Sequence, residues 1–141
     1  MLWVSDLMSY QIAAIFFGNH PVEDRSAGLA FMRGYIKACR FYYDNCLLKS
    51  GGQLVRGPHF DEVISYISKY TGGKPELIAM GLNYNDRDGR LDADDIQRQV
   101  DWYQQNGLIT RKLDAASIVD MSIWEEALQT LETRFQGRRE N

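Results

Sequence analysis

Cysteine is scarce in this 141-residue chain, which contains only Cys39 and Cys46. Two cysteines do not make the disulfide framework of a small secreted protein. They lie seven positions apart in one predicted helix. That spacing is about 10 Å along the helix axis, too far for a disulfide within it. We therefore expect both thiols to be free and to pack in the core.

Long hydrophobic runs and a strong charge of either sign are also missing. The longest apolar run, residues 12–17, is far shorter than the roughly 20 residues of a membrane-spanning helix. The formal net charge of −3 excludes a broadly basic nucleic-acid-binding protein. The first twenty residues contain no Lys or Arg, and Asp6 interrupts them, so no signal peptide is recognised. The chain as given is expected in the cytoplasm.

Motifs for catalysis and cofactor binding are absent as well. The two histidines, His20 and His59, are 39 positions apart and lack the spacing of a zinc site. The sequence has no nucleophile-elbow serine and no phosphate-binding glycine loop followed by Lys and Ser or Thr. We therefore predict a non-enzymatic protein without a cofactor.

The apolar residues of the sequence repeat mainly with the spacing of an α-helix. One apolar stripe repeats at intervals of three and four, through Leu29, Met32, Ile36, Cys39, Tyr43 and Cys46. A second stripe beside it contains Phe31, Tyr35, Ala38 and Tyr42. A helix so apolar around its circumference is typical of burial on two sides. We expect Met32, Ile36 and Cys39 to be almost fully buried, and Phe31 and Tyr35 to be largely covered.

Capping signals place the other helices. The predicted helices cover residues 21–49, 58–71, 76–80, 93–105 and 122–136, with a single turn at residues 115–119. Asp92 and Asp114 are predicted N-caps, and Ser122 with Glu125 forms a capping box. Asn106 and Gly107 end the helix that begins after Asp92, and Leu108 just beyond them fits a Schellman-type ending. The sequence thus predicts a mainly α fold of five or six helices with one or two short strands. We expect a single domain, 1–141, with a helical body at 19–136 and a frayed tail at 137–141.

Residues 1–18 allow two interpretations. The apolar run at residues 10–17 suits a strand buried on both faces. Spacings of three to four also suit a buried helix, through Leu2, Trp3, Leu7, Tyr10, Ala14 and Phe17. We favour the strand, although the rest of the sequence offers no obvious strand to pair with it.

An acidic loop at residues 84–95 partly matches an EF-hand calcium loop. With Gly89 at position 6 of the loop, four carboxylates fall at ligand positions, namely Asp86, Asp88, Asp92 and Asp95. Position 1 is Tyr84, which supplies no carboxylate, and position 12 is an Asp, shorter than the usual bidentate Glu. A glycine turn before a capped helix is the favoured interpretation, and a calcium-binding module is the alternative.

Aromatic residues are frequent, with three Trp, eight Tyr and six Phe. The clusters at residues 41–43 and 102–103 could line a pocket for a small molecule. A helical core explains most of them equally well. A protein with an aromatic ligand pocket is therefore a further alternative.

The order of the motifs resembles a known family. The stretches that carry the resemblance are residues 10–17, 19–24, 30–44, 61–72, 81–92, 99–109 and 113–120. In this order and spacing, they resemble the C-terminal portion of substrate-binding proteins of ABC importers, of the nitrate, sulfonate, taurine and thiamine-precursor type. The resemblance covers roughly residues 8 to 132. It implies a partial lobe of a type II periplasmic-binding-protein-like α/β fold and supports the strand at residues 10–17.

The same resemblance implies solute binding and a periplasmic location for the full-length family. Ligand pockets of this type lie between two lobes, and only one part of one lobe is matched here. Tyr10 and Gln11, beside the predicted strand, are the nearest candidates for ligand contacts. In the family the acidic loop corresponds to a Gly-Leu-x-x-x-Asp-Gly-Arg linker without calcium.

Self-association is the last expectation. A lone apolar strand leaves backbone groups and side chains without partners, and unpaired buried backbone groups cost roughly 1–3 kcal/mol each. Pairing with the same strand of a second copy supplies partners for these backbone groups and covers the side chains, most simply in a two-fold dimer. We expect Ile12, Ile15, Phe16 and Phe17 at the interface of this homodimer.

Overall fold

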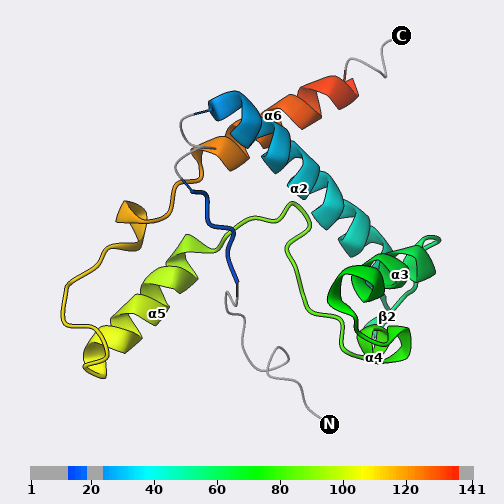
Figure 1. The fold of residues 1–141 in the computed structure, drawn as a ribbon, viewed down its shortest axis with the longest axis horizontal. Helices are drawn as coiled ribbons and strands as arrows, with labels where there is room; N and C mark the ends of the chain where they lie inside the picture. Colours follow the sequence, from blue (N-terminus) through cyan, green and yellow to red (C-terminus); the bar gives the residue numbers. More distant parts are fainter. Residues whose placement is uncertain (1–12, 19–23, 137–141) are drawn as a thin grey trace. The chain divides into compact units, whose positions relative to one another are not determined.

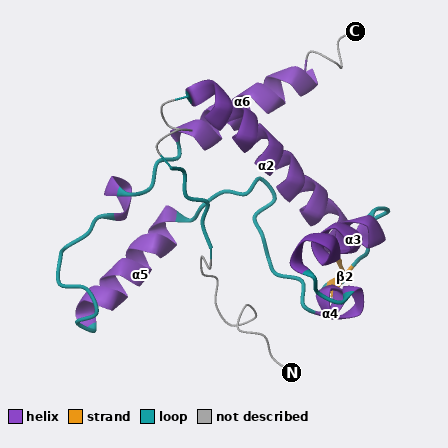
Figure 2. Cartoon of the chain, in the orientation of Figure 1, coloured by secondary structure: helices purple, strands orange, loops and turns teal. Residues whose placement is uncertain are grey.

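The computed structural model describes residues 13–18 and 24–136 of the chain. In this part the protein is mainly helical, with five α-helices, one short 3₁₀ helix and a small two-stranded sheet (Figures 1 and 2). Two compact units are recognised: residues 34–89, and the residues before and after them. None of the described helices is both long and apolar enough to cross a membrane.

The long helix α2 (Arg25–Cys46) is shorter at both ends than the sequence predicted. It starts at Arg25 because the Asp24 carboxylate accepts a hydrogen bond from the backbone N–H of Ala27, 3.0 Å away. This satisfies one of the N–H groups left without a partner at the helix start. The predicted start at Pro21 lies outside the described residues.

Burial around α2 confirms the first stripe and corrects the second. Met32, Ile36 and Cys39 are buried as predicted, and Ile36 has no exposed surface. Phe31 was expected to be largely covered, yet it is 53% exposed, and Tyr35 is only partly buried. Periodicity identifies apolar stripes, whereas burial requires neighbours on each side of the helix.

The short strands do not occur where the sequence placed one. Residues 13–18 form neither strand nor helix, and residues 10–12 of the predicted strand lie outside the described part. The sheet is instead a hairpin of β1 (Lys49–Ser50) and β2 (Gln53–Leu54), where a loop was expected. Its two-residue turn needs a left-handed backbone at both positions, which Gly51 and Gly52 supply with φ of 58° and 80°.

The core of the unit at residues 34–89 forms where the end of α2 meets α3 (Phe60–Thr71) and α4 (Pro75–Met80). Its buried members are Cys46, Leu47, Phe60, Val63 and Ile64. The buried Asn45 fixes the approach of the chain to α3, because its Oδ1 accepts the His59 N–H at 2.9 Å. Its Nδ2 donates to the Phe41 carbonyl at 2.8 Å, so both ends of the amide are used.

In the other unit, local capping signals mostly act as predicted. Asp92 caps α5 (Ala93–Gln105) by accepting from Asp95 N–H, and Asp114 caps the 3₁₀ helix η2 (Ala115–Ser117). After α5, the N–H of Leu108 bonds the Tyr103 carbonyl at 2.9 Å, which completes the predicted Schellman ending.

The last helix, α6 (Ser122–Gln136), begins with Ser122 as its first residue. Ser122 was predicted to be the N-cap, but the Asp120 carboxylate accepts the Ser122 N–H at 2.8 Å. Arg25 at the start of α2 donates from Nε and Nη2 to one oxygen of Glu126 of α6, Oε2, at 2.9 and 2.6 Å. The predicted tail at residues 137–141 lies outside the described residues.

Candidate functional site

Three of the four predicted interface residues lie in the described part of the chain, and two of these are exposed. Ile15 is 42% exposed and Phe16 is 89% exposed, whereas Phe17 packs edge-on against Phe31 with ring centroids 5.7 Å apart. This segment and the start of α2 line an open apolar hollow, to which Ala27 and Phe31 contribute. Ile12, Tyr10 and Gln11 lie outside the described residues, so their predicted roles are neither placed nor tested.

A second apolar surface runs along α2 itself. We call it the exposed face, and it consists of Ala27, Ala30, Phe31, Gly34, Lys37, Ala38 and Phe41, all of them exposed. Six of these seven residues are apolar. Ala27 and Phe31, at the start of α2, also line the hollow.

The apolar periodicity of α2 predicts a second stripe but does not separate its exposed residues from its buried ones. The second stripe was read through Phe31, Tyr35, Ala38 and Tyr42, whereas the exposed residues repeat at 27, 31, 34, 38 and 41. Tyr42 instead lies against the core, where its hydroxyl donates to the Asn83 carbonyl at 2.6 Å. Burial raises the pKa of Tyr42 to about 12, so it stays a neutral donor.

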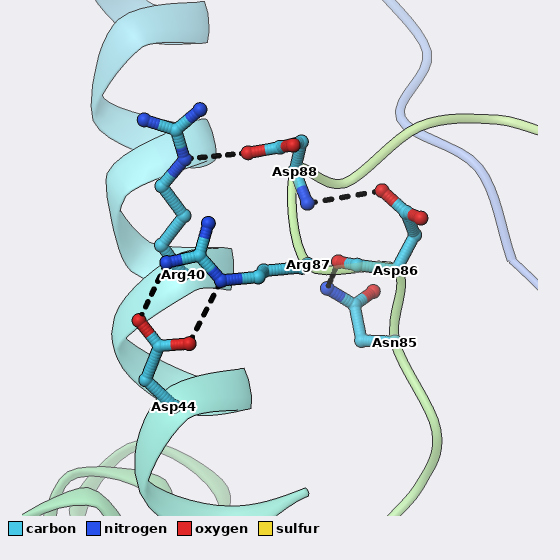
Figure 3. Close-up of polar contacts among 6 residues, drawn as sticks. All are labelled: Arg40, Asp44, Asn85, Asp86, Arg87 and Asp88. Carbon is cyan, nitrogen blue, oxygen red and sulfur yellow. Dashed lines mark hydrogen bonds and ion pairs between the residues drawn. The ribbon is translucent and has the colours of Figure 1, made fainter. Parts of the chain in front are cut away.

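Two arginine–carboxylate pairs hold the acidic loop against α2 (Figure 3). Arg87 donates from Nε and Nη2 to the two oxygens of Asp44, each at 2.8 Å, and Arg40 donates to Asp88. The hydrogen bonds from Arg87 lower the pKa of the Asp44 carboxyl. The loop is therefore held by ion pairs that need the carboxyl groups of Asp44 and Asp88 to be ionised.

The four candidate calcium ligands have other partners. Asp86 accepts the N–H of Asp88 at 2.9 Å, which is a turn contact, and Asp88 pairs with Arg40. Asp92 caps α5, and the buried Asp95 accepts from Arg98 at 2.9 Å and from Gln99 at 2.8 Å. Within residues 13–18 and 24–136, no group of three or more His, Cys, Asp and Glu side chains could hold a metal ion.

We predict that calcium leaves the stability of the protein unchanged. A ligand that binds the folded state raises stability by RT ln(1 + [L]/Kd), about 2.7 kcal/mol at a hundredfold excess over Kd. Since the carboxylates are used as caps and ion-pair partners, the melting temperature in millimolar calcium should equal that in magnesium or in EDTA. A rise specific to calcium, abolished by Asp88→Asn, would establish the calcium-binding alternative.

Tyr42, Tyr43 and both cysteines pack in or against the core, whereas Trp102 and Tyr103 are exposed. Tyr42 and Tyr43 pack against the core of residues 34–89, and Phe41 lies beside the His59 ring with centroids 5.6 Å apart. Trp102 and Tyr103 meet edge-to-face at 5.4 Å and are both exposed. Both cysteines are free and buried, as predicted, and burial raises the pKa of each thiol. They are therefore poor nucleophiles, since the thiolate is the reactive form.

Comparisons of the chain with protein-family models, with curated proteins and with solved structures found no match.

Proposed function

We propose that this chain is a non-enzymatic solute-binding segment of the ABC-importer binding-protein type. The observation that carries the proposal is the apolar character of α2 on two opposite sides, one buried and one exposed. Helices in layered α/β folds pack between other layers of secondary structure and bury apolar residues on more than one side. The order of the sequence motifs supports the same assignment.

The direct test is a thermal-shift titration of the purified chain. Nitrate, taurine and a pyrimidine precursor of thiamine represent the solutes implied by the resemblance. A bound solute at a hundredfold excess over Kd adds about 2.7 kcal/mol, which raises the melting temperature of a chain this size by several degrees. Chloride and alanine, at matched concentration, control for ionic and osmotic effects.

A variant carrying Tyr10→Ala and Gln11→Ala should lose the shift if these side chains contact the solute. Absence of any shift with all three solutes would contradict solute binding by this chain.

Oligomer formation is a second role, and a specific observation favours it. Ile15 and Phe16 are exposed in an extended apolar segment next to Phe31, so covering them in a homo-oligomer removes apolar surface from water. Light scattering should give a mass above the 16.2 kDa of one chain. Ile15→Lys should lower that mass, and a native protein that remains at one chain mass would contradict the proposal.

A further inference from the structure

A loop of the unit at residues 34–89 lies over the thiol of Cys39. We call residues 83–89, which come after α4, the strap. A Cβ built at Gly89 would lie 2.9 Å from Cys39 Sγ, so the strap backbone passes directly against the sulfur. The side chain of Asn85 forms a hydrogen bond with the same thiol. Because Cys39 is only 6% exposed, the strap is part of what separates it from water.

The strap is attached to α2 by polar contacts that water reaches (Figure 3). Arg87 of the strap pairs with Asp44 of α2, and these side chains are 48% and 42% exposed. Asp88 of the strap pairs with Arg40 of α2, and both side chains are partly exposed. An exposed ion pair shifts an equilibrium by only about fivefold or less. The two pairs therefore favour the position against α2, which we call closed, only moderately.

Burial contributes little to holding the strap. None of residues 83–89 is buried, and residues 82–86 have no regular secondary structure. Leu82 packs against the core of this unit and the Asn83 carbonyl accepts a hydrogen bond from Tyr42, so the strap is anchored at its start. Segments with few buried apolar contacts open locally at a lower free energy than the core unfolds. The strap can therefore leave α2 while the core stays intact.

We propose that the strap opens about its start while the core of the unit stays folded, and that opening makes the Cys39 thiol available for modification. Cys46, the other thiol, is 1% exposed and belongs to the core where α2 meets α3 and α4. It stays covered when the strap opens. The two free cysteines thus differ in the segment that must move before each one reacts. The inference is independent of solute binding and of oligomer formation.

A group attached to Cys39 would keep the strap open. In the closed position no further atom fits between the sulfur and Gly89, since a single carbon added at Gly89 would already lie 2.9 Å from Sγ. The ion pairs of Asp44 and Asp88 would then be lost as well. A covalent change at one thiol is thereby converted into the displacement of residues 83–89.

Labelling with N-ethylmaleimide tests the inference. The thiolate sulfur adds to one carbon of the maleimide double bond, and the neighbouring carbon takes a proton from water, so nothing leaves. Peptide mass mapping gives the labelling rate of each cysteine, which is divided by the rate of the same cysteine in the urea-unfolded chain. Cys39 is expected to label at least about tenfold faster than Cys46. Equal rates at the two thiols would overturn the inference, as would a Cys39 rate equal to that of the unfolded chain.

Low concentrations of urea distinguish local opening from unfolding. The dependence of a free energy on urea scales with the surface that becomes exposed. Opening of the strap exposes little surface, so the labelling rate of Cys39 should stay nearly constant below the unfolding transition, while that of Cys46 rises steeply. Parallel increases would mean that both thiols react only after unfolding, and the strap would then be no separate device.

Variants of one ion pair test whether it holds the strap. Asp44→Asn and Arg87→Gln should each raise the Cys39 rate about twofold to fivefold. The double variant should label no faster than either single variant, because both changes remove the same pair. Lys69→Gln, an equal loss of charge at an exposed position of α3, is the matched control and should leave the Cys39 rate unchanged. Circular dichroism checks that each variant is folded.

A core variant supplies the converse control. Ile64 is buried in the core that persists when the strap opens. Ile64→Val should therefore raise the Cys46 rate about twofold to tenfold and leave the Cys39 rate unchanged. A Cys39 rate that rises in Ile64→Val, or that does not respond to Asp44→Asn and Arg87→Gln, would overturn the strap as the cover of this thiol.

Discussion

Replacing Ile36 by Asp is expected to unfold the protein. Ile36 lies on the covered side of α2 and has no exposed surface. An uncompensated charge in such a position costs about 3–5 kcal/mol, against a total stability of about 5–15 kcal/mol. Circular dichroism at 222 nm should show loss of the cooperative melt or a large fall in melting temperature.

The matched control for this variant is Ile36→Val, which keeps the site apolar. Removal of one methylene there should cost only about 0.5–1.5 kcal/mol. If Ile36→Asp melted at the same temperature as the native chain, the packing of α2 described above would be incorrect.

Replacing Gly89 by Ala is expected to be the second most damaging of the single changes. Gly89 has a φ of 68°, in the left-handed region that L-residues rarely adopt. An added Cβ would also lie 2.8 Å from Tyr35 Cζ and 2.9 Å from Cys39 Sγ, closer than atoms pack. The left-handed backbone costs about 1–2 kcal/mol and the overpacking a further 1–3 kcal/mol.

Gly72→Ala separates these two causes. Gly72 ends α3 with a φ of 71°, yet a Cβ there would meet no atom of the described residues within 4 Å. Only the backbone cost of about 1–2 kcal/mol should appear in urea denaturation of this variant. Equal losses for the two variants would mean that Tyr35 and Cys39 move aside from Gly89 at no cost.

Features that depend on neighbours in the sequence were predicted well. Asp92 and Asp114 cap their helices, and Gly107 with Leu108 ends α5 as expected. A cap is made by a side chain and an N–H group two or three residues away, so the sequence contains all of its parts. The burial of Met32, Ile36 and Cys39 follows from helical periodicity in the same way.

Other features depend on how segments meet. The hairpin at residues 49–54 has strands of only two residues, which are too short to show an alternating pattern of apolar and polar side chains. In the sequence only the two turn residues, Gly51 and Gly52, indicate a hairpin. The contact of Arg87 with Asp44 joins residues 43 positions apart, and that of Arg40 with Asp88 joins residues 48 apart. Charged residues are too common for their sequence positions to predict such partners.

The sequence by itself determined that α2 is a helix with apolar residues on more than one side, because side-chain direction along a helix follows from its 3.6-residue period. That the side carrying Phe31 is not buried as well was decided only by the tertiary structure. Ile36 is covered by other segments of the chain, and Phe31, five residues earlier, remains half exposed. Burial is a property of the atoms that surround a side chain, and the segments that supply them are distant in sequence.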